Sequence, residues 1–188
     1  AESCCVAIAE ESAGDLEAKY AAESARFRTA LGELSAWCRE QKLSTEEERV
    51  AAWLPERAAD KSYYFLLDTS AEVAAEAADE SEFAKRFRAL RDEHAARLFT
   101  LAREAADDRE YSTAVKLTYE TLRENPLHPE ALKLLGFQIV GGRRLSAYEL
   151  AKQRAGQIWD RKFGWILAAH QTRYLKGERN LDGRWVSA

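Results

Sequence analysis

Two long stretches of the chain carry apolar residues at steps of three and four, and this spacing constrains the fold more than any other feature. The stretches run from about Asp15 to Gln41 and from about Ser81 to Ala106. Such spacing places apolar side chains along one stripe of an α-helix, which must be buried against a neighbour. The stripes consist of Leu16, Tyr20, Phe27, Leu31, Leu34 and Trp37, and of Phe83, Phe87, Leu90, His94, Leu98, Leu101 and Ala105. We therefore predict a mainly α fold based on a helical bundle.

The composition agrees with a globular helical protein. Of the 188 residues, 46% are hydrophobic and 32% are charged, with only 9 Gly and 3 Pro. This content is too apolar for a disordered chain. No apolar run approaches the roughly 20 residues that a membrane-spanning helix needs, so we predict no membrane span.

Local signals predict several shorter elements. Ser44 with Glu47, and Ser146 with Glu149, fit the capping box that opens a helix. The first of these helices should end at Pro55 and the second at about Ala155. The aromatic run in residues 61–67 favours an extended, buried segment instead.

Small and apolar residues recur between Leu98 and Gly136 in the pattern of two paired helices. They are Leu98, Leu101, Ala102 and Ala105, then Tyr111, Ala114, Thr118 and Thr121, then Pro126, and finally Leu135 and Gly136. This pattern resembles a tetratricopeptide repeat (TPR), a unit of about 34 residues in which small side chains let two helices approach closely. We predict a TPR-like pair at about 95–126 within a helical domain spanning 1–136, with an ordinary helical hairpin as the alternative.

The last part of the chain has a different pattern, with turn signals that recur. Gly141-Gly142, Phe163-Gly164 and Asp182-Gly183 are each flanked by apolar or β-branched residues, as in β-hairpins. Position 144 corresponds to 165 and then to 185. The sequence therefore predicts a module of β-hairpins and short helices over 137–188 with an internal repeat of 20–21 residues.

Acidic and basic residues are unevenly distributed, and the change lies close to the start of the predicted hairpin module. Residues 1–140 contain 18 Lys and Arg against 28 Asp and Glu, a balance of -10, whereas residues 141–188 contain 10 against 4, a balance of +6. Either the two parts attract each other, or the basic part meets an acidic partner. Aromatic residues among the basic ones also suggest nucleic-acid binding, but the acidic first 140 residues would repel a polyanion.

No catalytic or metal-binding pattern is found. The chain has no HExxH, GxSxG, P-loop or GxGxxG motif, and His94, His128 and His170 stand far apart. Three cysteines, Cys4, Cys5 and Cys38, match no zinc-site spacing. We expect Cys38 to be a buried structural thiol, with a bridge to Cys4 or Cys5 open in an oxidising compartment. We predict no enzyme activity, no cofactor and no metal within these residues.

The second half of the chain is similar to a group of uncharacterised secreted bacterial proteins, especially from planctomycete-like genomes. The similarity rests on residues 114–136 (AVKLTYETLRENPLHPEALKLLG) and on the later FGW, YLKGER and DGRWVS motifs. In such proteins the region often follows a signal peptide and can precede a domain that looks like a zinc peptidase. The resemblance implies an extracytoplasmic (periplasmic or secreted) protein and no catalytic residue in this chain.

Together these observations predict a non-catalytic helical scaffold or protein-interaction module that is part of a larger exported protein. Its partner would be a protein, a peptide or an adjoining domain of the same polypeptide. The candidate contact residues are Tyr111, Lys116, Tyr119 and Arg123 beside the helix pair, and Trp165 and Trp185 in the hairpins. A substrate-positioning domain of a metallopeptidase is the first alternative, and nucleic-acid binding through the basic segment is the second.

Overall fold

The computed structural model describes residues 2–53, 65 and 79–187, with side chains from residue 14 onward. Its elements are α1 (Glu2–Glu40), α2 (Ser44–Ala51), α3 (Glu82–Asp107), α4 (Tyr111–Glu124), α5 (Pro129–Leu134), β1 (Phe137–Val140), β2 (Arg143–Ser146), α6 (Ala147–Arg154), β3 (Gln157–Asp160), β4 (Gly164–Leu167), the 3₁₀ helix η2 (Ala168–His170), α7 (Gln171–Leu175), β5 (Glu178–Leu181) and β6 (Arg184–Ser187). The predicted mainly α fold, followed by small β-hairpins and short helices, is confirmed. The predicted helix end at Pro55 and most of the aromatic run at 61–67 lie outside the described residues.

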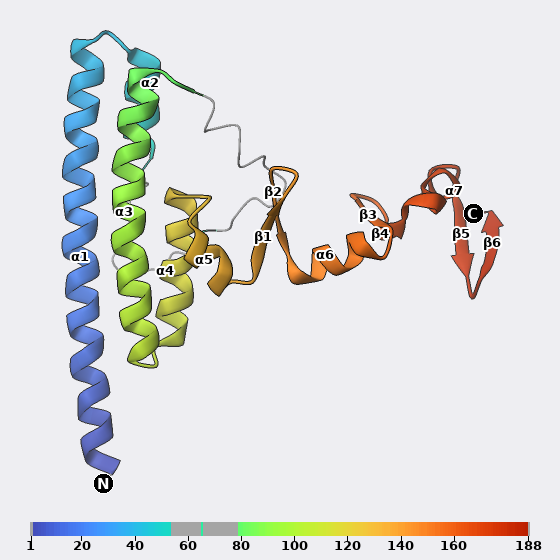
Figure 1. The fold of residues 1–188 in the computed structure, drawn as a ribbon, viewed down its shortest axis with the longest axis horizontal. Helices are drawn as coiled ribbons and strands as arrows, with labels where there is room; N and C mark the ends of the chain where they lie inside the picture. Colours follow the sequence, from blue (N-terminus) through green and yellow to red (C-terminus); the bar gives the residue numbers. More distant parts are fainter. Residues whose placement is uncertain (1, 54–64, 66–78, 188) are drawn as a thin grey trace.

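The bundle consists of α1, α3 and α4, which lie side by side and alternate in direction (Figure 1). The stripe on α1 packs against α3 in two places. The lower cluster joins α1, α3 and α4 through Leu16, Leu98, Leu101, Ala102, Ala105, Ala114 and Leu117. The upper cluster joins α1, α2 and α3 through Phe27, Leu31, Leu34, Cys38, Val50, Phe83 and Phe87.

The predicted helix pair is present as α3 and α4. Ala102 and Ala105 have no exposed surface and Ala114 is 4% exposed, so small side chains do lie where the two helices come close. Ser81 caps α3, because its hydroxyl accepts a hydrogen bond from the Ala84 backbone N–H at 3.1 Å. The closeness of α3 and α4 therefore has the physical cause that the sequence pattern indicated.

The start of α2 differs from the prediction. Leu43 precedes α2 as its cap residue and Ser44 is already helical, with no side-chain cap. The Glu47 carboxylate lies 2.7 Å from Arg39 Nη2 across the α1–α2 turn. The Glu47 carboxylate, which the predicted capping box would bond to the Ser44 backbone, is paired with Arg39 instead.

Cys38 is a free thiol with no exposed surface, as expected for a structural cysteine. The helix α1 runs without interruption from Glu2 to Glu40. At 1.5 Å per residue, Cys4 and Cys38 are about 50 Å apart along its axis. A disulfide between the two within one chain is therefore incompatible with this fold.

The C-terminal residues 137–187 form an arm that extends away from the bundle (Figure 1). It contains three separate antiparallel hairpins, β1–β2, β3–β4 and β5–β6, joined by α6 and by η2 with α7. Arg144, Trp165 and Trp185 each occupy the second position of the returning strand. The residues that the 20–21-residue spacing relates thus have equivalent places in the hairpins.

Each hairpin is reached through a glycine that ends the preceding helix. Gly136, Gly156 and Gly177 have φ angles of +70°, +73° and +90°, a backbone region that side chains with a Cβ rarely adopt. The first hairpin is also attached to the bundle: Phe137 packs on the cluster of Phe99, Leu122, Ala131 and Leu132. The arm is therefore anchored at one end and repeats the same turn geometry outward.

Candidate functional site

The four candidate residues beside the helix pair do not form one free surface. Tyr111, the first residue of α4, is 65% exposed. Lys116, Tyr119 and Arg123 are half-buried. The Lys116 ammonium lies 6.0 Å from the centre of the Tyr20 ring on α1. The Arg123 guanidinium donates to the Trp53 carbonyl oxygen and to Glu124.

Arg123 belongs to a buried ionic cluster around Glu124, whose side chain is 1% exposed. The Glu124 carboxylate accepts a hydrogen bond from Trp53 Nε1 at 2.9 Å and lies 3.0 Å from Arg123 Nη1 and 3.5 Å from Arg91 Nε. The Arg91 guanidinium stacks over the Trp53 ring at 4.2 Å. Burial raises the pKa of Glu124, and the charges of Arg123 and Arg91 oppose that rise. The cluster joins α3 and α4 to the residues that follow α2, so its role is structural.

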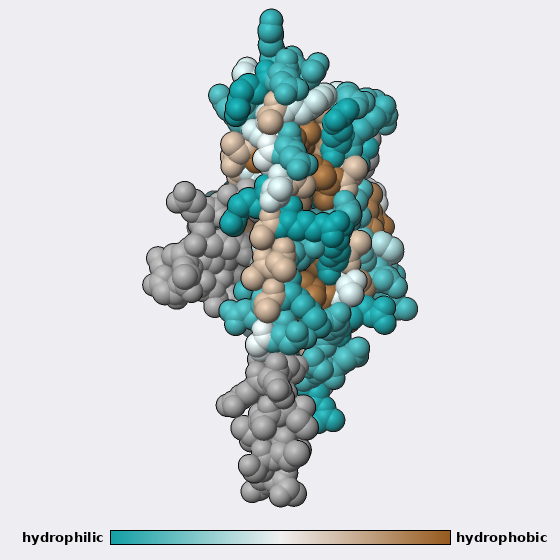
Figure 2. All heavy atoms as spheres, turned by 90° about the vertical axis from the view of Figure 1, so that its left-hand side faces the viewer, coloured by the Kyte–Doolittle hydropathy of each residue, from teal (hydrophilic) through white to brown (hydrophobic). Residues whose placement is uncertain are grey.

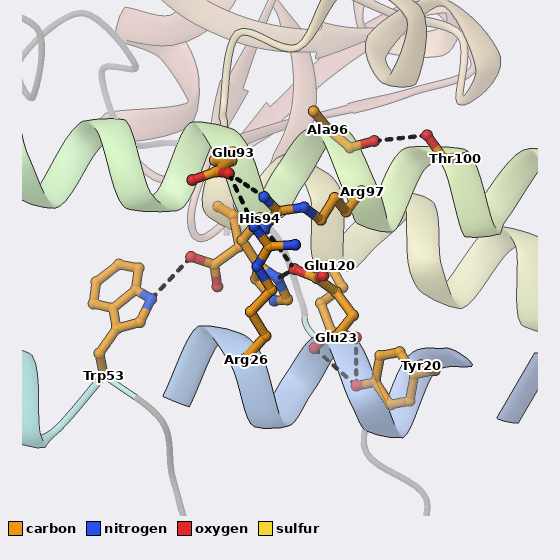
Figure 3. A network of polar contacts seen from close by, with 11 residues as sticks. Tyr20, Glu23, Arg26, Trp53, Glu93, His94, Ala96, Arg97, Thr100 and Glu120 are labelled. Atoms are coloured by element: carbon orange, nitrogen blue, oxygen red, sulfur yellow. Dashed lines mark hydrogen bonds and ion pairs between the residues drawn. The ribbon is translucent and has the colours of Figure 1, made fainter. Parts of the chain in front are cut away.

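A second polar network lies between α1 and α3 (Figure 3). Its buried pair consists of His94 Nδ1 and Glu23 Oε1, 2.9 Å apart, with Arg97 Nη1 3.3 Å from the same oxygen. The His94 ring stacks on Phe27 with centroids 3.9 Å apart. Next to this pair, the Tyr20 hydroxyl donates to the Glu120 carboxylate at 2.9 Å.

The second network explains a histidine in an apolar stripe. His94 is a packed residue, as we expected, but sequence reasoning missed its partner Glu23. The available signal was position: Glu23 lies between Tyr20 and Phe27, at the helical spacing of the α1 stripe. The His94 and Glu23 side chains are only 5% and 10% exposed, so the network joins helices and offers no open site.

The open cavity with the clearest chemical character lies in the arm, between the first two hairpins. It has a volume of about 930 Å³. Its lining includes the aromatic residues Phe137, Tyr148, Trp159 and Trp165. Tyr148 is 60% exposed and Trp159 is 61% exposed. We call this cavity the aromatic pocket.

Ring contacts order the aromatic pocket. Trp165 meets the Trp159 ring across the β3–β4 pair at 5.8 Å and the Tyr148 ring of α6 at 6.3 Å, both edge-on. Edge-on contacts of this kind stabilise aromatic pairs beyond the area that they bury. Trp165 is itself half-buried, so it supports two rings that are more exposed than it is.

Two polar side chains of the aromatic pocket are hydrogen-bonded to each other. The capping box predicted at Ser146 is present: Glu149 Oε2 accepts from the Ser146 backbone N–H at 2.7 Å and from its hydroxyl at 2.8 Å. The Glu149 carboxylate and the Ser146 hydroxyl of the lining are thus hydrogen-bonded to each other. Arg143 on the lining is exposed and basic.

The other hairpin candidate, Trp185, lies elsewhere. It is half-buried in the third hairpin, 4.9 Å from the His170 ring and 5.3 Å from the Tyr174 ring. Of the six candidate residues, only Trp165 reaches the aromatic pocket. Sequence reasoning missed Tyr148 and Trp159 as surface residues, although both stand next to polar residues in short elements where full burial was not required.

Metal ligation has no support within the described part of the chain, where no three His, Cys, Asp or Glu side chains are grouped so that they could hold an ion. Among these same residues, no helix has the length and apolar character needed to cross a membrane. Comparisons of the chain with protein-family models, with curated proteins and with solved structures found no match. The resemblance to a TPR and to secreted bacterial proteins therefore stays a prediction.

Proposed function

We propose that this chain is a protein-interaction module in which the helical bundle holds the hairpin arm and the aromatic pocket docks a segment of another protein. The observation that carries the proposal is the exposure of Trp159 and Tyr148 on either side of Trp165. Trp, Tyr and Arg are the residue types that most often dominate binding energy at protein interfaces. Arg143 adds the third type at the rim of the same pocket.

The charge of the arm indicates the chemistry of the partner. Residues 141–188 have a balance of +6, and Arg143, Arg154 and Arg161 are exposed. A segment with an apolar or aromatic anchor and flanking Asp or Glu residues would fill the pocket and pair with this charge. Export from the cytoplasm and membership of a larger polypeptide belong to the same proposal, supported by the sequence resemblance.

The groove beside α4 is the less favoured surface for this function. The Lys116 ammonium lies over the Tyr20 ring, and the Arg123 guanidinium donates to the Trp53 carbonyl oxygen. Substituting either residue with Glu would therefore disturb the bundle as well as the binding of a partner. The hypothesis of a metallopeptidase accessory domain concerns residues outside this chain and predicts the same binding role.

A selection from a random peptide library on the immobilised chain tests the proposal. We expect the enriched peptides to carry one large apolar residue flanked by acidic residues. Trp159→Ala should weaken the best peptide by about tenfold or more, as expected when an interface anchor of this type is truncated. Affinity is measured by fluorescence anisotropy with the synthetic, labelled peptide.

Tyr111→Ala provides the matched control, because Tyr111 is an aromatic residue of similar exposure (65% against 61%) on the bundle. It should bind the selected peptide as the unmodified chain does. If the Trp159→Ala variant bound the selected peptide as tightly as the unmodified chain, the aromatic pocket would be excluded as the peptide-binding site. Tight, strongly salt-dependent binding of a single-stranded oligonucleotide that requires Trp159 would favour the nucleic-acid alternative instead.

A further inference from the structure

The turn between α3 and α4 carries apolar side chains that the bundle leaves exposed. Tyr111, the first residue of α4, is 65% exposed, and Val115, four residues later, is 47% exposed. Residues four apart lie on the same side of a helix, so the two side chains extend together from the start of α4. Asp107 and Asp108, at the end of α3, are exposed as well. Residues 107–111, which we call the Tyr111 turn, thus combine an aromatic anchor with flanking acidic residues.

The backbone of the Tyr111 turn is fixed by hydrogen bonds. The Arg109 N–H donates to the Ala106 carbonyl oxygen at 3.1 Å, and the Glu110 N–H donates to the Ala105 carbonyl oxygen at 2.8 Å. This pair of bonds is the Schellman motif that ends many helices, with Arg109 at a φ of +68° in the left-handed region. Because the turn is already ordered, its binding to another surface would cost little conformational entropy.

The charges around the Tyr111 turn and around the aromatic pocket are opposite. Residues 104–110 contain four Asp and Glu against one Arg, a balance of -3, and residues 143–162 contain six Lys and Arg against two Asp and Glu, a balance of +4. Arg143 lines the aromatic pocket, and Arg154 and Arg161 in the same stretch are exposed. Opposite charges on two surfaces speed their encounter and disfavour wrong partners.

These two surfaces of one chain lie apart. All the described residues that line the aromatic pocket lie between Phe137 and Ala168. The arm leaves the bundle after α5 and extends away from it, whereas the Tyr111 turn lies at one end of the helices (Figure 1). The basic surface of the arm is therefore available to the acidic surface of a second copy.

We propose that the aromatic pocket of one copy binds the Tyr111 turn of a second copy, with Tyr111 between the Tyr148 and Trp159 rings and the acidic residues of the turn facing Arg143. This inference rests on the proposed function, since it names the partner of the same pocket. A cavity of about 930 Å³ has room for a tyrosine side chain and its neighbours. Because the pocket and the turn are different surfaces, a copy that uses its pocket still presents its turn, and the head-to-tail contact can continue through further copies.

Sedimentation velocity of the full chain tests the proposal over concentrations of about 1 μM to 1 mM. We expect the mean mass to rise with concentration above that of the monomer, and to fall when salt is added because exposed charges are screened. Tyr111→Ala and Trp159→Ala should each weaken the association by about tenfold or more, as expected when an aromatic anchor of an interface is truncated. Arg143→Glu should weaken it too, without removal of an aromatic ring.

A mixture of the two alanine variants separates this contact from any other. Tyr111→Ala keeps the pocket and Trp159→Ala keeps the turn, so one pairing remains between them. An equimolar mixture should form a 1:1 pair that grows no further, at concentrations where each variant alone is a monomer. Circular dichroism at 222 nm verifies that each variant is folded.

Leu134→Ala and Leu175→Ala are the matched controls, because both leucines are exposed (57% and 67%) and lie outside the turn and the pocket. Neither change should alter the association. The proposal is overturned if the unmodified chain stays monomeric over the whole range, or if the mixed variants pair no better than each variant alone. It is also overturned if the leucine variants weaken the association as much as the aromatic ones.

Binding of the selected peptide distinguishes failure of this proposal from failure of the proposed function. At a chain concentration below that of self-association, Tyr111→Ala binds the peptide as the unmodified chain does. A chain that binds the peptide through Trp159 but stays monomeric would keep the pocket as a site for another protein and lose only the second copy as its partner. If Trp159→Ala changed neither peptide binding nor self-association, both proposals would fail.

Discussion

The bundle and the arm are stabilised in different ways. In the bundle, residues far apart in sequence share continuous apolar clusters, and buried charges are paired across helices: Glu23 with His94, and Glu124 with Arg91. In the arm, each hairpin buries few side chains. The second and third hairpins make ring contacts with the short helix α7, and only the first is described as packing on the bundle, through Phe137.

The two regions also differ in the surface that they expose. The bundle surface formed by α1 is mainly hydrophilic, with apolar groups confined to narrow strips (Figure 2). The arm instead exposes large apolar side chains along its length, such as Tyr148, Trp159 and Leu181. A stretch of exposed apolar groups beside basic ones is typical of an interaction surface. In the function proposed above, the bundle would supply stability and the arm would supply the contacts with a partner.

The largest expected effect comes from breaking the ionic cluster of the bundle. Glu124→Ala removes the carboxylate that lies 3.5 Å from Arg91 Nε, on a side chain that is 6% exposed, and removes the acceptor of Trp53 Nε1. Breaking a buried ion pair in this way costs about 3–5 kcal/mol of the free energy of unfolding. Urea denaturation followed by circular dichroism at 222 nm measures the change.

Glu33→Ala is the control for that variant, because Glu33 is an exposed acidic residue of α1. Its unfolding free energy should stay within about 0.5 kcal/mol of the unmodified chain. If Glu124→Ala were equally harmless, the cluster would not hold the bundle together and the contrast with the arm would weaken.

The sequence predicted local features of the fold better than contacts between distant residues. Two kinds of signal that act over a few residues were reliable: the Ser146–Glu149 box, and the turns at Gly141-Gly142 and Asp182-Gly183. The fold class and the α3–α4 pair also followed, because one stripe of a helix must be buried.

Pairings between distant residues could not be predicted. The partners Tyr20–Glu120 and Trp53–Glu124 are 100 and 71 residues apart, so no local pattern joins them. The same limit explains the candidate site. The direction in which Arg123 points depends on where Trp53 lies, and the aromatic pocket depends on how one hairpin follows another. The capping box at Ser44 was wrong because α2 begins at Ser44 itself, with Leu43 as its cap residue, and Glu47 pairs with Arg39 of α1.

A pair of core truncations sharpens the comparison of the two regions. Leu98, with no exposed surface, lies in the bundle, and Ile166, 5% exposed, lies in the arm. Each change to alanine should cost about 2–4 kcal/mol locally. Leu98→Ala should lower the unfolding midpoint of the whole chain, whereas Ile166→Ala should speed hydrogen exchange in β3–β4 and leave the bundle amides unchanged. Faster exchange in α1 and α3 of the Ile166→Ala variant would show that the two regions unfold together.

The smallest expected effect concerns the joint between bundle and arm, where His128 caps α5. The Ala131 N–H donates to His128 Nδ1 at 3.3 Å, which requires a ring unprotonated at that nitrogen. Burial lowers the pKa of His128 below its ordinary value of 6.5, against the opposing charges of Glu130 and Asp92. Between the two pKa values the unfolded chain binds the proton more readily than the folded chain. The free energy of unfolding should therefore fall slightly as pH drops from about 7 through 6.5 toward the folded pKa.

His128→Asn isolates this effect, because asparagine can also accept the Ala131 hydrogen bond as a helix cap but does not titrate. The difference in unfolding free energy between the unmodified chain and this variant should shrink or change sign as pH falls from 7 to 5, as measured by urea denaturation at several pH values. His128→Ala, which removes the cap at every pH, should instead lose about 1 kcal/mol at pH 7. A constant difference between the unmodified chain and His128→Asn would mean that the ring stays in one protonation state, and that the joint holds the arm independently of pH.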